Sequence, residues 1–203
     1  MTLAELARLI VGRAETSQGR FLTALAGPPA SGKSTVAEDL RDAVLALGQK
    51  CEVVPMDGFH LDNSILSARG LLPRKGAPET FDAAGFATMI DRLKQGGEVI
   101  IPTFDRSRDI AIAGARAVPS DCKILIVEGN YLLFDDPAWH RLAPLWDFSI
   151  FLNVAEPVLE ARLIQRWLDH GLATDAARAR AEGNDLPNAR RILAARLAAD
   201  IDL

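Results

Sequence analysis

The sequence predicts an α/β fold with a mostly parallel sheet that helices cover on both faces, and three observations support this prediction. Short apolar runs alternate with amphipathic segments along most of the 203 residues. Residues 123–128 and 148–152 are almost continuously apolar, which is typical of parallel strands buried on both faces. A glycine-rich loop joins another apolar run to an amphipathic segment. The length suits one large domain, so we expect a single domain over residues 1–203.

The first part of the chain is expected to hold two helices and two strands. Leucine and isoleucine recur at helical spacing over 2–15, which predicts an amphipathic helix. Residues 21–26 form an apolar run that ends at a glycine, as a strand before a tight turn does. A second amphipathic helix is expected over 33–47, because Gly48 follows it as a C-terminal capping residue. Residues 51–56 are the next predicted strand, which an Asp-Gly pair ends.

The middle of the chain alternates loops and helices before the next strand. A short helix is expected over 62–68. Residues 69–80 include two prolines and two glycines, so we interpret this stretch as a loop. Asp82 is placed to cap a helix that runs to residue 95, where two glycines end it. Residues 98–104 form a predicted strand, and a polar loop is expected after it.

The last part of the chain combines the two buried strands at 123–128 and 148–152 with basic helices. Arginine-rich helices are expected over 156–170, 175–182 and 186–198. Tyr131 and Trp139 are interpreted as packing residues. The pattern shows no internal repeat, so the predicted fold is one continuous α/β layer structure.

Composition excludes several classes of function. The net charge is −4 and no long basic tract occurs, so we expect no nucleic-acid partner. No apolar run approaches the ~20 residues of a membrane span, so we expect no membrane insertion. Cys51 and Cys122 are the only cysteines, and both lie in apolar stretches without a Cys/His cluster. We therefore expect neither a disulfide framework nor a zinc site, and a cytoplasmic location.

One loop carries a specific motif, Gly-x-x-x-x-Gly-Lys-[Ser/Thr]. Its residues are Gly27, Pro28, Pro29, Ala30, Ser31, Gly32, Lys33, Ser34 and the following Thr35. Backbone amides of such a loop bind phosphate oxygens at a helix N-terminus, where the dipole favours anions. Lys33 is expected to contact the β- and γ-phosphates, and the Ser34 hydroxyl to bind Mg²⁺. The sequence therefore predicts a P-loop NTPase fold that binds ATP and Mg²⁺.

Two acidic residues follow predicted parallel strands. Asp57 comes after the strand 51–56, and Glu128 ends the strand 123–128. Ligands bind beyond the carboxyl ends of parallel strands, so both side chains are expected near the phosphates. Asp57 could accept a proton from a hydroxyl, and Glu128 could orient Mg²⁺. Each could instead only stabilise the turn that follows it.

Several segments together resemble the uridine kinase, phosphoribulokinase and bacterial pantothenate kinase group of P-loop kinases. They are the phosphate loop 27–34, Met56–His60, Phe104–Arg106, Val127–Gly129 and the helix carrying Arg162 and Arg166. Within that group, residues 56–62 look most like the branch labelled nucleoside kinase or fructose-transport-system kinase. Uridine kinases place tyrosines after the catalytic aspartate, whereas Phe59 and His60 stand here.

The resemblance implies roles for individual residues. Asp57 matches the group's general base, and Lys33 its phosphate-binding lysine. Arg162 and Arg166 match a lid at approximately 160–185, whose arginines close over the transferring phosphoryl group. Asp105 stands where relatives carry a Tyr-Asp or Phe-Asp pair near the acceptor. We therefore expect an acceptor site formed by Asp57, Phe59, His60, Asp105 and Glu128, although His60 could instead be a solvated loop residue.

We therefore expect an ATP-dependent kinase that phosphorylates a hydroxyl of a small molecule, such as a sugar, a nucleoside or a pantothenate-like alcohol. A regulatory P-loop protein linked to transport that hydrolyses nucleotide is a second interpretation, although no guanine-reading Asn-Lys-x-Asp motif occurs. A nucleoside monophosphate kinase is a third. It would use the basic loop at Arg69, Arg74 and Lys75, which could equally be a solvated surface.

Overall fold

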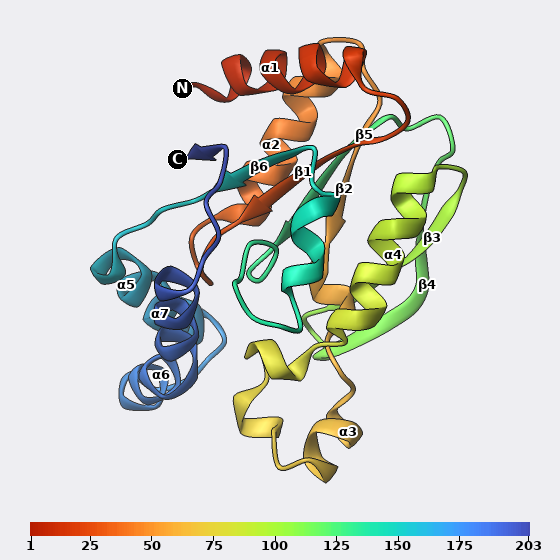
Figure 1. Ribbon diagram of the computed structural model, residues 1–203. Helices are drawn as coiled ribbons and strands as arrows, with labels where there is room; N and C mark the ends of the chain where they lie inside the picture. Colours follow the sequence, from red (N-terminus) through yellow and green to blue (C-terminus); the bar gives the residue numbers. More distant parts are fainter.

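The computed structural model describes residues 1–203 and centres on a parallel sheet of five strands (Figure 1). The strands are β1 (Phe21–Ala26), β2 (Cys51–Pro55), β5 (Ile124–Gly129), β6 (Phe148–Phe151) and β7 (Ile201–Asp202). Their order across the sheet is β2-β5-β1-β6-β7, and every pairing is parallel. The prediction of an α/β fold with a parallel sheet is confirmed.

Helices cover both faces of this sheet, as the buried apolar strands require. Helices α1 (Leu3–Thr16) and α2 (Lys33–Ala46) pack on one face, and α4 (Ala83–Gln95) packs on the other. Side chains along β5 alternate between the two layers: Ile124 and Ile126 join the core beneath α1 and α2, and their neighbours join the core beneath α4. The strand is therefore buried on both sides, which explains its continuous apolar sequence.

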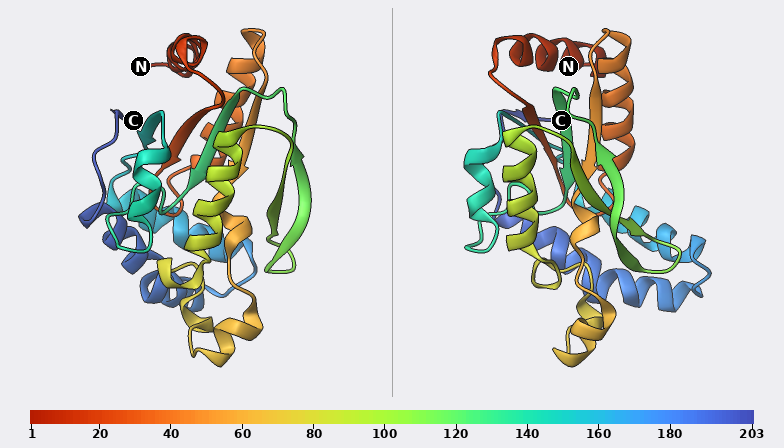
Figure 2. Two further views of the ribbon diagram at one scale, coloured as in Figure 1. Left: turned by 45° about the vertical axis from the view of Figure 1, so that its right-hand side comes forward. Right: turned by 90° about the vertical axis from the view of Figure 1, so that its right-hand side faces the viewer.

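A second, smaller sheet lies apart from the first. Strand β3 (Val99–Asp105) pairs antiparallel with β4 (Ile110–Val118), and Figure 2 shows this ribbon standing beside the main sheet. The expectation of a loop after β3 was wrong over β4, because that strand is rich in alanine and only its last residue is buried. It therefore shows no hydrophobic alternation. The ribbon packs closely at Gly58, where a Cβ atom would lie 2.7 Å from the Pro102 carbonyl oxygen.

Two groups of helices lie beyond the carboxyl ends of the strands. The first is the short α3 (Asn63–Ala68), followed by the 3₁₀ turns Leu72–Arg74 and Pro78–Thr80. The second gathers α5 (Glu156–Asp169), α6 (Thr174–Arg180) and α7 (Leu186–Ala194), with a π-helical turn at Ala181–Asp185 (Figure 1). This second group has a small core of its own, formed by Leu163, Ala181 and Leu186.

The end of the chain differs from the expected helix 186–198. Helix α7 stops at Ala194, and Arg196 forms an isolated bridge with Phe134 before β7 begins. Arg196 also forms an ion pair with Asp202, with 2.8 Å between the two side chains. These contacts are long-range, so helical periodicity alone could not locate the end of the helix. No helix in the structure is both long and apolar enough to cross a membrane.

The two aromatic residues and both cysteines lie in the interior. Tyr131 and Trp139 are 0% and 1% exposed, and both belong to the core beneath α4. Cys51 and Cys122 are buried and unbridged. Burial raises the pKa of the Cys122 thiol to about 11, so this side chain is a neutral packing group.

Candidate active site

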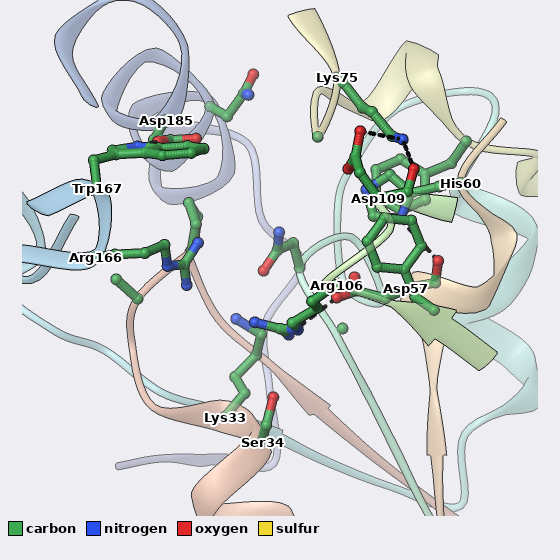
Figure 3. A pocket seen from close by; sticks show the side chains of 18 of the residues that line it. Lys33, Ser34, Asp57, His60, Lys75, Arg106, Asp109, Arg166, Trp167 and Asp185 are labelled. Atoms are coloured by element: carbon green, nitrogen blue, oxygen red, sulfur yellow. Dashed lines mark hydrogen bonds and ion pairs between the residues drawn. The ribbon is translucent and has the colours of Figure 1, made fainter. Parts of the chain in front are cut away.

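A cavity of about 880 Å³ opens beyond the carboxyl ends of the parallel strands. The phosphate loop forms its floor, α5 and α7 form one wall, and residues between Asp57 and Phe81 form the opposite wall with the tip of the β3–β4 ribbon. Figure 3 shows this arrangement, with Arg166 and Trp167 facing His60 and Lys75 across the space above Lys33. The fold thus brings residues more than 100 positions apart in the sequence, such as Lys33 and Arg166, into one cavity.

The phosphate loop has the conformation of an anion site. Gly32 has φ +96°, a left-handed conformation that glycine adopts without strain, and it directly precedes α2. Ala30 also has a positive φ of 62°, which costs about 1 kcal/mol in a residue with a Cβ atom. No side chain caps the N-terminus of α2. Its first amide groups therefore remain available to a phosphate.

Lys33 is buried at the end of this loop without an ionic partner. Its Nζ atom donates hydrogen bonds to the Pro28 carbonyl at 2.8 Å and to the Ser31 hydroxyl at 3.4 Å. Burial lowers the pKa of Lys33 to about 8, although the carboxylates of Glu128 and Asp57 favour its charged form. The free protein thus holds a poorly compensated ammonium group where the motif predicts phosphate.

Ser34 and Glu128 supply neighbouring oxygen atoms, 3.4 Å apart. Burial, helped by repulsion from Asp57, raises the pKa of Glu128. No cluster of three or more His, Cys, Asp or Glu side chains suited to a metal exists in the structure. Mg²⁺ characteristically uses one or two protein oxygens and completes its shell with water and phosphate, so this pair fits the ion.

Asp57 lies at the start of the 3₁₀ turn that follows β2 and faces the cavity. Its carboxylate forms an ion pair of 3.2 Å with Arg106 at the ribbon tip. His60 lines the same wall between the rings of Phe81 and Phe104, at centroid distances of 4.0 and 4.5 Å. Its Nδ1 atom lies 2.8 Å from the Asp57 carbonyl oxygen, and burial lowers its pKa.

The structure does not bring Phe59 and Asp105 to this cavity. Phe59 packs edge-on against Phe86, with ring centroids 5.2 Å apart, on the core side of the turn. The Asp105 carboxylate accepts hydrogen bonds from Ser107 and Arg108, and these hold its pKa well below its usual range. Both residues support local structure here. The ribbon contributes Phe104, Arg106 and Asp109 to the cavity instead.

The two predicted lid arginines do reach the phosphate side of the cavity. Arg162 donates hydrogen bonds of 3.3 Å to the carbonyl oxygens of Ala30 and Ser31. Arg166 lines the cavity one turn further along α5, where burial and the nearby Arg106 lower its pKa. Trp167 follows, and its indole N–H donates to the Asp185 carboxylate at 2.6 Å.

Sequence patterns identified only some of the residues that form the cavity walls. The side chain of Lys75 is only 8% exposed and pairs with Asp109 at 2.9 Å. It also donates to the Asn63 side chain at 2.7 Å. Arg69 does not line the cavity. The cationic side chains of the loop 69–75 that reach the cavity are therefore paired with other side chains of the protein. Asp185 lines the cavity from the end of the π-helical turn and Asn188 from the first turn of α7, and no motif marks either residue.

Comparison with known families gives a clear result. A family model described as "Phosphoribulokinase / Uridine kinase family" matches residues 22–182. The chain belongs to this family. The match runs from β1 to the start of the π-helical turn and so includes every cavity residue except Asp185 and Asn188, in agreement with the resemblance found in the motifs.

Individual relatives extend this finding. A crystal structure from Silicibacter sp. TM1040, described as a "putative fructose transport system kinase", is 59% identical with a TM-score of 0.97, over 100% of this chain and 99% of that one. The uncharacterized protein YggC of Escherichia coli is 39% identical over 179 residues, which cover 87% of this chain and 74% of YggC. A pantothenate kinase of Mycolicibacterium vanbaalenii is 34% identical over 152 residues, 73% of this chain but about half (48%) of that relative.

Proposed function

We propose that this family member transfers the γ-phosphate of ATP to a hydroxyl group of a small molecule. The observation that carries the proposal is that Asp57 lines the same cavity as the phosphate loop. A protein that only bound or hydrolysed nucleotide would need the loop but would not need a proton acceptor across from it. The negative charges of Asp57 and Glu128 also favour the charged form of Lys33, so these three side chains interact electrostatically.

Each residue then has a distinct task. Lys33, Arg162 and Arg166 neutralise charge on the phosphate oxygens, which is the main protein contribution to phosphoryl transfer. Ser34 and Glu128 would hold Mg²⁺, which would neutralise negative charge on the phosphate oxygens. Asp57 accepts the proton of the attacking hydroxyl. Arg106 pairs with one carboxylate oxygen of Asp57, and the other oxygen has no partner within the protein and is free to face the hydroxyl.

The helices α5 to α7 are proposed to act as the lid, centred on residues 160–185 of a single domain. Their separate small core supports movement as one unit. Arg166 lies on this unit while Lys33 lies on the sheet side, so closure would bring their charges together around one phosphate. A cytoplasmic location remains part of the proposal.

The acceptor is proposed from the family and the cavity together. Names among the relatives point to fructose, uridine and pantothenate, and all three offer a hydroxyl group. A monophosphate kinase would need free cations on the loop 69–75. Lys75 is instead paired with Asp109, and Arg74 lies 3.5 Å from Glu79, so we do not favour that alternative.

The test is acceptor-stimulated release of ADP. Purified protein is incubated with Mg²⁺-ATP and a panel of sugars, nucleosides and pantothenate-like alcohols, and each product is checked for phosphate by mass spectrometry. Slow basal hydrolysis that one acceptor accelerates supports the kinase. Hydrolysis that no acceptor accelerates, and that Asp57→Asn leaves unchanged, would instead support the regulatory nucleotide-hydrolysing alternative.

A further inference from the structure

Cationic side chains from three separate elements meet in one part of the cavity. Lys33 comes from the phosphate loop, Arg166 from α5 and Arg106 from the tip of the β3–β4 ribbon. Besides burial, repulsion from Arg106 lowers the pKa of both Lys33 and Arg166. Of the three, only Arg106 forms an ion pair. An anion that binds between like charges relieves their repulsion, so this part of the cavity fits a phosphate group.

Arg106 lies between the phosphate side of this space and the side that carries Asp57. Figure 3 shows its guanidinium group between the side chains of Lys33 and Asp57. Its Nη2 atom donates a hydrogen bond of 3.2 Å to the Oδ2 atom of Asp57. This is the only hydrogen bond that the guanidinium group makes, and its other N–H groups can bind a second acceptor. An arginine at this position can therefore contact two anionic groups at once.

The position of the ribbon tip relative to Asp57 is fixed by packing. The backbone of Gly58 lies so close to β3 that a Cβ atom there would have no room. The ring of Phe104 packs on the imidazole of His60, with 4.5 Å between the centroids. Both contacts join β3 to the turn that carries Asp57. Arg106 is therefore presented to Asp57 by contacts that do not depend on the ion pair itself.

We infer that Arg106 is a further catalytic residue of the proposed kinase reaction, which holds the Oδ2 atom of Asp57 and at the same time contacts the transferring phosphoryl group. This inference rests on the proposed function and deepens it. The ion pair leaves the Oδ1 atom of Asp57 to accept the proton of the hydroxyl. The second contact places positive charge beside the phosphoryl oxygens during transfer. Arg106 thus aligns the hydroxyl with the phosphoryl group from the acceptor side, whereas Arg166 acts from α5.

The first test is the kinetics of Arg106→Ala with the acceptor that most stimulates ADP release by the wild type. We expect kcat to fall about 10²–10³-fold and the ATP dissociation constant to change less than about fivefold. The Arg106 side chain is 61% exposed, so the variant should keep a Tm within about 2 °C of wild type. A kcat within about threefold of wild type overturns the inference and leaves the kinase intact. A wild type that no acceptor stimulates overturns the proposed function, and the inference falls with it.

Two further variants separate the charge of Arg106 from the structure of the ribbon. Arg108→Ala is the matched control, because Arg108 also pairs with an aspartate at the ribbon tip but does not line the cavity. It should change kcat less than about threefold, and a loss as large as that in Arg106→Ala would overturn the role of Arg106. Arg106→Lys keeps the charge and should be about tenfold faster than Arg106→Ala. Equal rates of these two variants would contradict a role that depends on charge.

The last test distinguishes the two contacts of Arg106. If this residue acted only through Asp57, Arg106→Ala would have no effect in a protein that already carries Asp57→Asn. We expect the double variant to be about tenfold slower than Asp57→Asn alone, because the contact with the phosphoryl group is then also lost. Equal rates of the double variant and Asp57→Asn would refute the phosphoryl contact and with it the inference.

Discussion

Replacing Lys33 by methionine should abolish turnover and yet stabilise the free protein. The lysine is buried, and its pKa falls from 10.5 to about 8 mainly through desolvation. A shift of this size corresponds to about 3 kcal/mol of unfavourable free energy for the charged form at neutral pH. Methionine fills a similar volume without charge but leaves the Pro28 carbonyl unsatisfied, at a cost of about 1–2 kcal/mol. The net gain is about 1–2 kcal/mol, or a rise in Tm of about 2–8 °C.

The pH dependence gives this prediction a second signature. A depressed lysine pKa means that the folded wild type releases its proton at about pH 8, while the unfolded chain keeps it to about pH 10.5. The stability of the wild type therefore rises across this window relative to the variant. The advantage of Lys33→Met should be largest at about pH 7 and should shrink by about pH 9.5.

The assay is thermal unfolding of both proteins at the two pH values, with and without Mg²⁺-ATP. Wild type should gain stability from the nucleotide, and Lys33→Met should gain far less, because a direct phosphate contact is lost. Lys50→Met is the control, since this lysine is exposed and pairs with Asp121 on the surface. A Lys33→Met protein that is less stable than wild type at both pH values would refute the reasoning about the buried charge.

Three further predictions follow from the same cavity. Asp57→Asn should lower kcat by about 10²–10⁴-fold with ATP affinity retained, and steady-state kinetics within threefold of wild type would make Asp57 a turn residue only. Arg166→Ala should lower kcat by about 10²-fold or more and change the ATP dissociation constant less than about fivefold, whereas the exposed Arg178→Ala should do neither. Trp167→Phe leaves the half-buried Asp185 carboxylate without its indole donor, so the free energy of unfolding should fall by about 1 kcal/mol, and an unchanged Tm would contradict this.

The sequence predicted the floor of the cavity well and its walls poorly. The phosphate loop combines a rare spacing with a strand before it and a helix after it, so its position and conformation followed from local pattern alone. The same holds for Asp57 and Glu128, because the end of a strand is a local feature and parallel strands share one edge. These residues needed no knowledge of long-range packing.

The walls depend on contacts that no local pattern encodes. Asp105 follows a phenylalanine as the resemblance requires, but its carboxylate bonds the next turn, and Arg106 occupies the cavity instead. Strand β4 could not be recognised from the sequence, because exposed alanines give no hydrophobic periodicity. Its pairing with β3 places Asp109 beside Lys75. Asn188 reaches the cavity only because α7 packs against the other helices of its group, and no motif marks it.

The path of the chain through α5, α6 and α7 also determines how these helices can move. They form an excursion between β6 and β7, which are neighbours in the same sheet. Both ends of this excursion are attached to the sheet layer: the Leu152 amide donates to the Ala26 carbonyl at 2.8 Å where the chain leaves, and the Ala195 carbonyl accepts from the Asp135 amide at 2.8 Å where it returns. A segment attached at both ends has less freedom than one attached at a single end. If these helices act as the proposed lid, we therefore expect a restricted movement that brings Arg166 to the same place beside the phosphate loop each time.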